Sequence, residues 1–139
     1  MPANDEGDDA LIAQAREAQT RAYAPYSRFR VGAAVRAGDA TFTGANVENA
    51  SYGLSICAER NAVVAAVLAR QVPLDEVAIA SDASPPASPC GMCRQTLLEF
   101  ARDPATFRVV AVNHDGDRKE WRLAELIPDG FTGEELRKG

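Results

Sequence analysis

The chain has 139 residues, of which 46% are hydrophobic, so its size suits a single domain with a core of its own. Its 20 acidic and 15 basic side chains give a formal net charge of -5, which disfavours binding to a polyphosphate such as nucleic acid. No apolar run approaches the roughly 20 residues of a membrane-spanning helix. These properties favour a small or neutral ligand and exclude membrane insertion.

The N-terminal segment is polar and lacks the pattern of a secretory signal. We therefore expect residues 1–8 to form a disordered tail, residues 9–139 to form one domain, and the protein to be cytoplasmic. From Asp9 to Tyr23 apolar residues recur at helical spacing, and Pro25 ends the run. This pattern predicts an amphipathic helix.

Two short segments with a preference for β-strand follow, residues 29–35 and 40–47, separated by Ala37-Gly38-Asp39. They predict a hairpin. Residues 48–56 are polar and are expected to form a loop.

A helix is predicted from Cys57 to Arg70, and it is apolar nearly all round rather than along one stripe. Such a helix must be covered on several sides. Since one sheet and its neighbours do not suffice for this in so short a chain, we expect a second subunit to cover part of it.

The rest of the chain alternates between strands and helices. We expect a buried strand at 76–80, a proline-rich loop at 81–89, a helix at 91–101, strands at 107–112 and 119–123, and a helical turn at 124–127. This order predicts an α/β fold in which helices cover a mixed sheet. The opening hairpin is expected to be antiparallel and the later strands parallel.

The three cysteines are the most informative residues. Cys90 and Cys93 are separated by two residues at a predicted helix start, a spacing shared by redox pairs, halves of structural zinc sites and buried cysteines. Cys57 begins the other helix, so all three thiols lie at helix starts, where the partial positive charge of the helix favours thiolate. With no fourth cysteine, one coordination position stays open, which is typical of a catalytic zinc ion.

Two charged residues follow Cys57. Glu59 lies in the first helical turn, from which its carboxylate can face the open metal position as a general base. Taken alone, a first-turn glutamate would only complement the helix dipole. Arg60 lies one turn from Cys57 and would offset the negative charge of three thiolates around Zn²⁺. His114, the single histidine, lies in a polar turn and is not expected to take part.

Cys57-Ala58-Glu59-Arg60 and Pro89-Cys90-Gly91-Met92-Cys93 resemble the zinc signature of the cytidine deaminase family. The resemblance extends to residues 24–34 and 44–53 and covers most of residues 10–131. Its best fit is the small homotetrameric branch with three cysteine ligands. It implies a three-layer α-β-α domain with a mixed five-stranded sheet. It also implies zinc-dependent hydrolytic deamination of cytidine and 2′-deoxycytidine, with release of ammonia, in pyrimidine salvage.

The resemblance further implies substrate contacts. Asn46 and Glu48 would hydrogen-bond the ribose hydroxyls, and Phe29 would pack against the nucleoside. Without the resemblance, the first two residues would be interpreted as a polar turn and Phe29 as a core aromatic. The backbone N–H of Ala58 is a plausible donor to the base carbonyl, because first-turn amides lack partners within the helix.

In similar tetrameric enzymes a neighbouring subunit completes the pocket. The segment matching Ala50 to Tyr52 would reach the 5′ end of the sugar, and a C-terminal aromatic would lie near the base. Phe131 is the candidate for that aromatic.

Three alternatives remain open at this stage. The first is a relative that acts on another aminopyrimidine nucleoside, such as a nucleoside antibiotic, although Asn46-Val47-Glu48-Asn49 favours ordinary cytidine. The second is editing of polynucleotide cytosines, which needs a basic groove that the acidic composition disfavours. The third is a zinc-stabilised binding module without chemistry, which the open coordination position and Glu59 disfavour.

Overall fold

A computed structural model describes residues 5–137 of the chain. Its elements, in chain order, are α1 (Asp5–Gln19), β1 (Val31–Ala37), β2 (Ala40–Ala45), the 3-10 turn η1 (Tyr52–Leu54), α2 (Ala58–Leu68), β3 (Glu76–Ser81), α3 (Gly91–Phe100), β4 (Arg108–Val112), β5 (Arg118–Arg122), α4 (Leu123–Leu126) and α5 (Gly133–Arg137).

The five strands form one sheet in the order β2-β1-β3-β4-β5. β1 pairs antiparallel with both β2 and β3, whereas β3 and β4 are parallel. All six residues of β3 are buried, as expected for the central strand of a sheet covered on both faces. The predicted mixed five-stranded sheet is confirmed.

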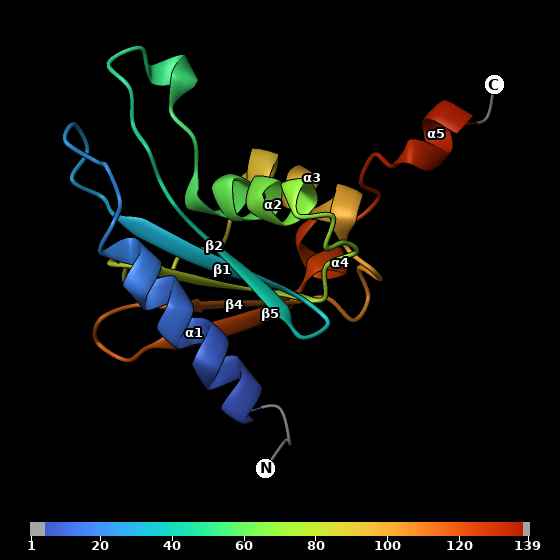
Figure 1. The fold of residues 1–139 in the computed structure, drawn as a ribbon, viewed down its shortest axis with the longest axis horizontal. Coiled ribbons are helices and arrows are strands. Elements are labelled where there is room, and N and C mark those ends of the chain that lie inside the picture. The colour runs from blue at the N-terminus through green and yellow to red at the C-terminus, as the bar shows by residue number, and fades with distance from the viewer. Residues whose placement is uncertain (1–4, 138–139) are drawn as a thin grey trace.

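Helices cover both faces of this sheet (Figure 1). α1 packs on one face, where Leu11 and Ala15 join a buried cluster with Ala34, Ala78 and Val110. α2 and α3 lie on the other face over a larger buried cluster. The three-layer α-β-α arrangement is therefore confirmed, and the two helices that begin beside cysteines share one layer.

A close approach of backbone to backbone fixes α2 against the sheet. A Cβ atom at Gly44 of β2 would overlap the backbone nitrogen of Ala62 and lie 2.6 Å from the carbonyl oxygen of Ala58. Only glycine allows a helix to lie this near a strand. The first turns of α2, which follow Cys57 directly, are thus held at a defined height above β2.

The last strand corrects one prediction. β5 pairs antiparallel with β4 rather than parallel. The two strands are joined by residues 113–117 alone, and a parallel neighbour would require a crossover of a dozen residues or more. The strand at 119–123 was thus predicted in nearly the right place but with the wrong direction.

The N-terminal end of the fold also differs from prediction. α1 begins at Asp5, so part of the expected tail is helical. No proline lies between Asp5 and Leu11 to stop the helix. The rest of that tail, residues 1–4, lies outside the described residues. The charged C-terminal stretch contains α5, which extends away from the body of the fold (Figure 1). Within residues 5–137, no helix combines the length and apolarity needed to cross a membrane.

Candidate metal centre and pocket

The three cysteines meet where α2 and α3 begin. Cys57 is the N-cap residue of α2, Cys90 is the N-cap residue of α3, and Cys93 lies in the first turn of α3. The Cys57 and Cys90 sulfurs are 4.0 Å apart, the Cys90 and Cys93 sulfurs are 3.4 Å apart, and all three lie within 4.8 Å of one another. All three cysteines are free.

This donor set fits a zinc ion. A tetrahedral Zn²⁺ with Zn–S bonds of about 2.3 Å holds its sulfurs about 3.8 Å apart, close to the separations found here. Thiolate is also a ligand that Zn²⁺ accepts readily, and three of them leave a fourth position open. The predicted metal ligands are therefore brought together in a geometry that suits catalytic zinc.

One of the three thiols, Cys57, favours the thiolate form without a metal. The hydrogen bond with the Cys93 thiol and the nearby Arg60 lower the pKa of Cys57 to about 5. The same contact with Cys57, together with burial, raises the pKa of Cys93. Arg60 Nη2 donates to the Cys57 sulfur at 3.4 Å. One thiolate is thus prepared at the site, with a cation in contact with it.

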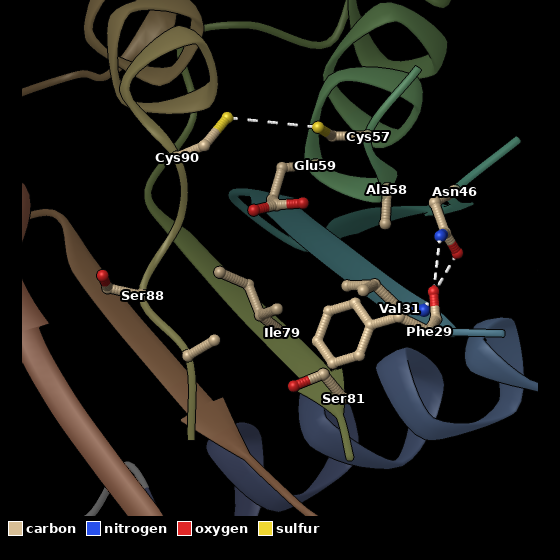
Figure 2. A pocket seen from close by; sticks show the side chains of 11 residues that line it. Phe29, Val31, Asn46, Cys57, Ala58, Glu59, Ile79, Ser81, Ser88 and Cys90 are labelled. Atoms are coloured by element: carbon tan, nitrogen blue, oxygen red, sulfur yellow. Dashed lines mark hydrogen bonds between the residues drawn. The ribbon is translucent and has the colours of Figure 1, made fainter. Parts of the chain in front are cut away.

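Glu59 is the buried carboxylate of the site. It is only 6% exposed, and burial raises its pKa to about 7, with the Cys57 thiolate adding to the effect. Figure 2 shows its carboxyl group below the Cys57 and Cys90 side chains, on the side of the pocket. A group placed there is able to exchange protons with a molecule held beside the thiols.

A pocket of about 220 Å³ opens next to the sulfurs. Six residues predicted from the sequence line it, namely Phe29, Asn46, Cys57, Ala58, Glu59 and Cys90 (Figure 2). Their sequence positions span residues 29 to 90, and the fold brings them to one place. The walls are mostly apolar, as is usual for a site that holds a flat ring.

Sequence reasoning missed five residues that also line this pocket, which are Val31, Ile79, Ser81, Ala87 and Ser88. Val31 begins β1 and is the pairing partner of Ser81, the last residue of β3. Ligands in α/β sheets bind beyond the carboxyl ends of parallel strands, so the end of the central strand β3 was the available signal.

Asn46 lies on the wall with its amide already engaged. Its Oδ1 accepts from the backbone N–H of Val31 at 2.9 Å, and its Nδ2 donates to the Phe29 carbonyl at 2.8 Å (Figure 2). These bonds tie the residue to the segment that carries Phe29. One amide hydrogen and one lone pair remain for a ligand.

Glu48 does not line the main pocket. Its carboxylate accepts from the backbone N–H groups of Tyr26 and Ser27 and from the Ser27 hydroxyl, which lower its pKa with the hydroxyl as the largest cause. It lines a second cavity of about 310 Å³ together with Tyr26 and Tyr52, whose rings meet edge to face at 6.4 Å.

The residues expected to serve a neighbouring subunit are exposed. Tyr52 is 78% and Phe131 55% exposed, Ala50 is exposed, and none of the three lines the main pocket of its own chain. His114 is also exposed, near Asp82 and Asp115, and does not line the main pocket.

Comparison with known proteins identifies relatives of the whole domain. Residues 5–110 match the family model described as the cytidine and deoxycytidylate deaminase zinc-binding region. A cytidine deaminase of Halalkalibacterium halodurans is 43% identical over 127 residues, which cover 91% of this chain and 95% of that protein. One of Mycobacterium tuberculosis is 39% identical over 127 residues, covering 91% and 90%.

A solved structure agrees with these relatives. The crystal structure of cytidine deaminase from Burkholderia pseudomallei superimposes with a TM-score of 0.83 at 44% identity, covering 88% of this chain and 98% of that one. The matched region is the zinc-binding region of the family, and the metal of this family therefore agrees with the donor set formed by the three cysteines.

Proposed function

The chain belongs to the cytidine and deoxycytidylate deaminase family. On that basis we propose that it hydrolyses cytidine and 2′-deoxycytidine to uridine and 2′-deoxyuridine, with release of ammonia, in pyrimidine salvage. The observation that carries this proposal is the buried Glu59 carboxyl beside three clustered thiols, of which Cys57 and Cys90 line the pocket together with Glu59.

The metal is held by Cys57, Cys90 and Cys93 in this proposal, with one Zn²⁺ in each chain. Bound there, Zn²⁺ supplies the Lewis acid that makes a water molecule a nucleophile at neutral pH. Three thiolates around a divalent ion leave a net charge of about one negative unit, which weakens the Lewis acid. The contact of Arg60 with Cys57 supports its role in offsetting that charge.

Glu59 moves the protons of the reaction. It takes one proton from the attacking water and delivers it to N3 of the pyrimidine while the water oxygen bonds to C4. It then passes the second proton of the water to the amino group. The C4–N bond breaks, ammonia leaves, and the ring keeps a carbonyl at C4.

The base and sugar are held by the pocket walls. Phe29 lies beside the space for the base, and the free N–H of Ala58 at the start of α2 is available to the base carbonyl. Asn46 and Glu48 bind the ribose hydroxyls in this proposal. Asn46 keeps one donor and one acceptor free, and the Glu48 carboxylate has acceptor capacity left beyond its bonds to Tyr26 and Ser27.

We also propose that the enzyme is a homotetramer whose neighbouring subunits complete each pocket. Val64 and Leu68 of α2 are 52% and 79% exposed, which supports the expectation that another subunit covers this helix. Ala50, Tyr52 and Phe131 would act in the pocket of a neighbour. Residues 9–139 form a single catalytic domain in this proposal. We also propose a cytoplasmic location, because zinc binding by three cysteines needs them reduced.

Mixing of two impaired variants tests the shared pocket. Phe131→Ala is expected to lower kcat/KM about tenfold, because stacking of a base on an aromatic ring is worth about 1–3 kcal/mol. Glu59→Gln lacks the proton-carrying carboxyl group in its own pocket. When the two variants are co-expressed, the mixed tetramers contain pockets with both residues intact. Activity above the average of the two parents is therefore expected.

The control for this mixture is a pair of single variants whose affected residues both act in the pocket of their own chain. Glu59→Gln co-expressed with Cys90→Ala should recover nothing, because every pocket then lacks one of the two groups. If Phe131→Ala and Glu59→Gln also gave only the average of their separate activities, the proposed exchange of residues between subunits would be wrong.

A substrate panel separates the proposed activity from its rivals. Product analysis with cytidine, deoxycytidine, substituted aminopyrimidine nucleosides and a single-stranded oligonucleotide should give turnover of the first two. Turnover of a substituted nucleoside with none of cytidine would favour the first alternative. Turnover of the oligonucleotide alone would overturn the small-substrate proposal, which the net charge of -5 supports.

A further inference from the structure

Cys90 is the proposed zinc ligand whose position is least explained by the core. Cys93 is fully buried, whereas Cys90 is exposed. It follows residues 82–89, which contain no helix or strand and connect β3 to α3. Three prolines in this loop, at positions 85, 86 and 89, have no N–H to donate. Pro86 and Pro89 are buried, but hydrogen bonds that orient the backbone before Cys90 must use other groups.

Arg94 makes the contacts that meet this need. Its Nε donates to the carbonyl oxygen of Pro89 at 2.7 Å, and its Nη2 donates to the Ser88 hydroxyl at 2.9 Å. Its Nη1 donates to the carbonyl oxygen of Leu126 at 2.9 Å. A single half-buried guanidinium thus joins the two residues before Cys90 to the end of α4.

The place of Arg94 in α3 makes these bonds relevant to the metal. Arg94 follows Cys93 directly, and its backbone N–H donates to the Cys90 carbonyl at 2.9 Å. The guanidinium is a planar fork, so its two bonds to the loop, with a third that anchors it to Leu126, hold the loop at a defined position relative to α3. The loop position in turn sets where Cys90 and the pocket residue Ser88 lie.

We propose that Arg94 is a positioning residue that holds the Ser88–Pro89 backbone, and through it the Cys90 thiol, in place for zinc. It touches neither substrate nor metal. This inference rests on the proposed zinc site. It adds that the end of α4, at Leu126, stabilises that site through its contact with Arg94. An outer partner that orients a metal ligand contributes about 10–100-fold to metal affinity or activity.

Arg94→Lys tests the proposal because it keeps the charge and removes the fork. We expect zinc to be lost to a chromogenic chelator at a concentration at least about tenfold lower than for the unchanged chain. Arg21→Lys, in the turn that follows α1 and with its side chain 77% exposed, is the matched control and should hold zinc normally. Circular dichroism of each zinc-loaded variant checks the fold.

Ser88→Ala removes one of the three bonds and leaves the arginine in place. Alone it should weaken zinc binding by a smaller factor, and combined with Arg94→Lys it should add little, because the shared hydrogen bond is already lost. If Arg94→Lys does not fold, Ser88→Ala decides alone, and unchanged zinc affinity would overturn the proposal. Unchanged affinity in a folded Arg94→Lys, or fully additive losses in the double variant, would also overturn it.

The outcome for the unchanged chain separates this inference from the proposed function. A chain that binds zinc but does not deaminate cytidine would refute the function, and the Arg94 comparison would still decide the positioning role. A chain that binds no zinc would overturn the positioning role together with the metal site.

Discussion

Replacement of Glu59 by glutamine should lower kcat by about 10²–10⁴-fold while one zinc ion per chain is retained. Glutamine keeps the shape of the side chain but cannot take up and return a proton. Glu59 is only 6% exposed, so bulk water does not replace its carboxyl group readily. Steady-state kinetics with cytidine, together with metal analysis of the same samples, measure both quantities.

Glu99→Gln is the matched control for this variant. Glu99 is exposed on α3 and does not line the pocket, so the same change of charge there should leave kcat unaltered. A Glu59→Gln enzyme that worked near the unchanged rate would show that the carboxyl is not the proton carrier. Loss of zinc from that variant would show that it acts on the metal instead.

Removal of a proposed ligand should have a larger effect on the metal. Cys90→Ala is expected to abolish stoichiometric zinc binding and to lower activity by more than about 100-fold. That exceeds the effect of losing a residue that only orients a metal ligand. Cys90 is exposed, so alanine leaves no cavity in the core there, whereas Cys93 is fully buried and its replacement would also affect stability. Zinc content and melting temperature measure the two effects separately.

Met92→Ala serves as the control, because Met92 lies between the two cysteines in sequence but is 64% exposed and does not line the pocket. It should bind zinc and remain active. If Cys90→Ala retained stoichiometric zinc and activity, the three-thiol site would be wrong, and the metal would have to be bound elsewhere.

Local sequence pattern was sufficient to predict most of the fold. The strands and helices occur close to their expected positions, because their periodicity and their turn residues agree with the tertiary structure. The direction of β5 was predicted wrongly because strand composition does not encode pairing direction. The short connection of residues 113–117 does, and it was the better guide.

The candidate site was predictable where its residues sit at the start of a helix. Cys57, Glu59 and Cys93 lie at the starts of α2 and α3. The sequence predicts where these two helices begin, so it also places these residues. Their catalytic and ligand roles stay predictions. The clustering of three thiols agrees with zinc, and the family comparison gives the same metal.

Other parts of the site depend on long-range packing. Val47 bridges to both Tyr23 and Ile56, and the Glu48 carboxylate meets the backbone of Tyr26 and Ser27. The local sequence does not indicate these contacts, and the role of Glu48 toward the ribose stays a prediction. Likewise, nothing near position 94 in the sequence indicates that its guanidinium reaches the carbonyl of Leu126. Such contacts follow from the fold and were not accessible to local pattern.

One assay follows the ultraviolet change of cytidine to uridine with purified protein before zinc chelation, after it, and after zinc is restored. If three thiolates and Glu59 form a zinc-dependent cytidine deaminase, turnover disappears with the metal and returns with it, while circular dichroism shows the fold retained in the metal-free sample. Turnover that survives complete zinc removal, or a zinc-loaded protein that leaves cytidine unchanged, would contradict that assignment.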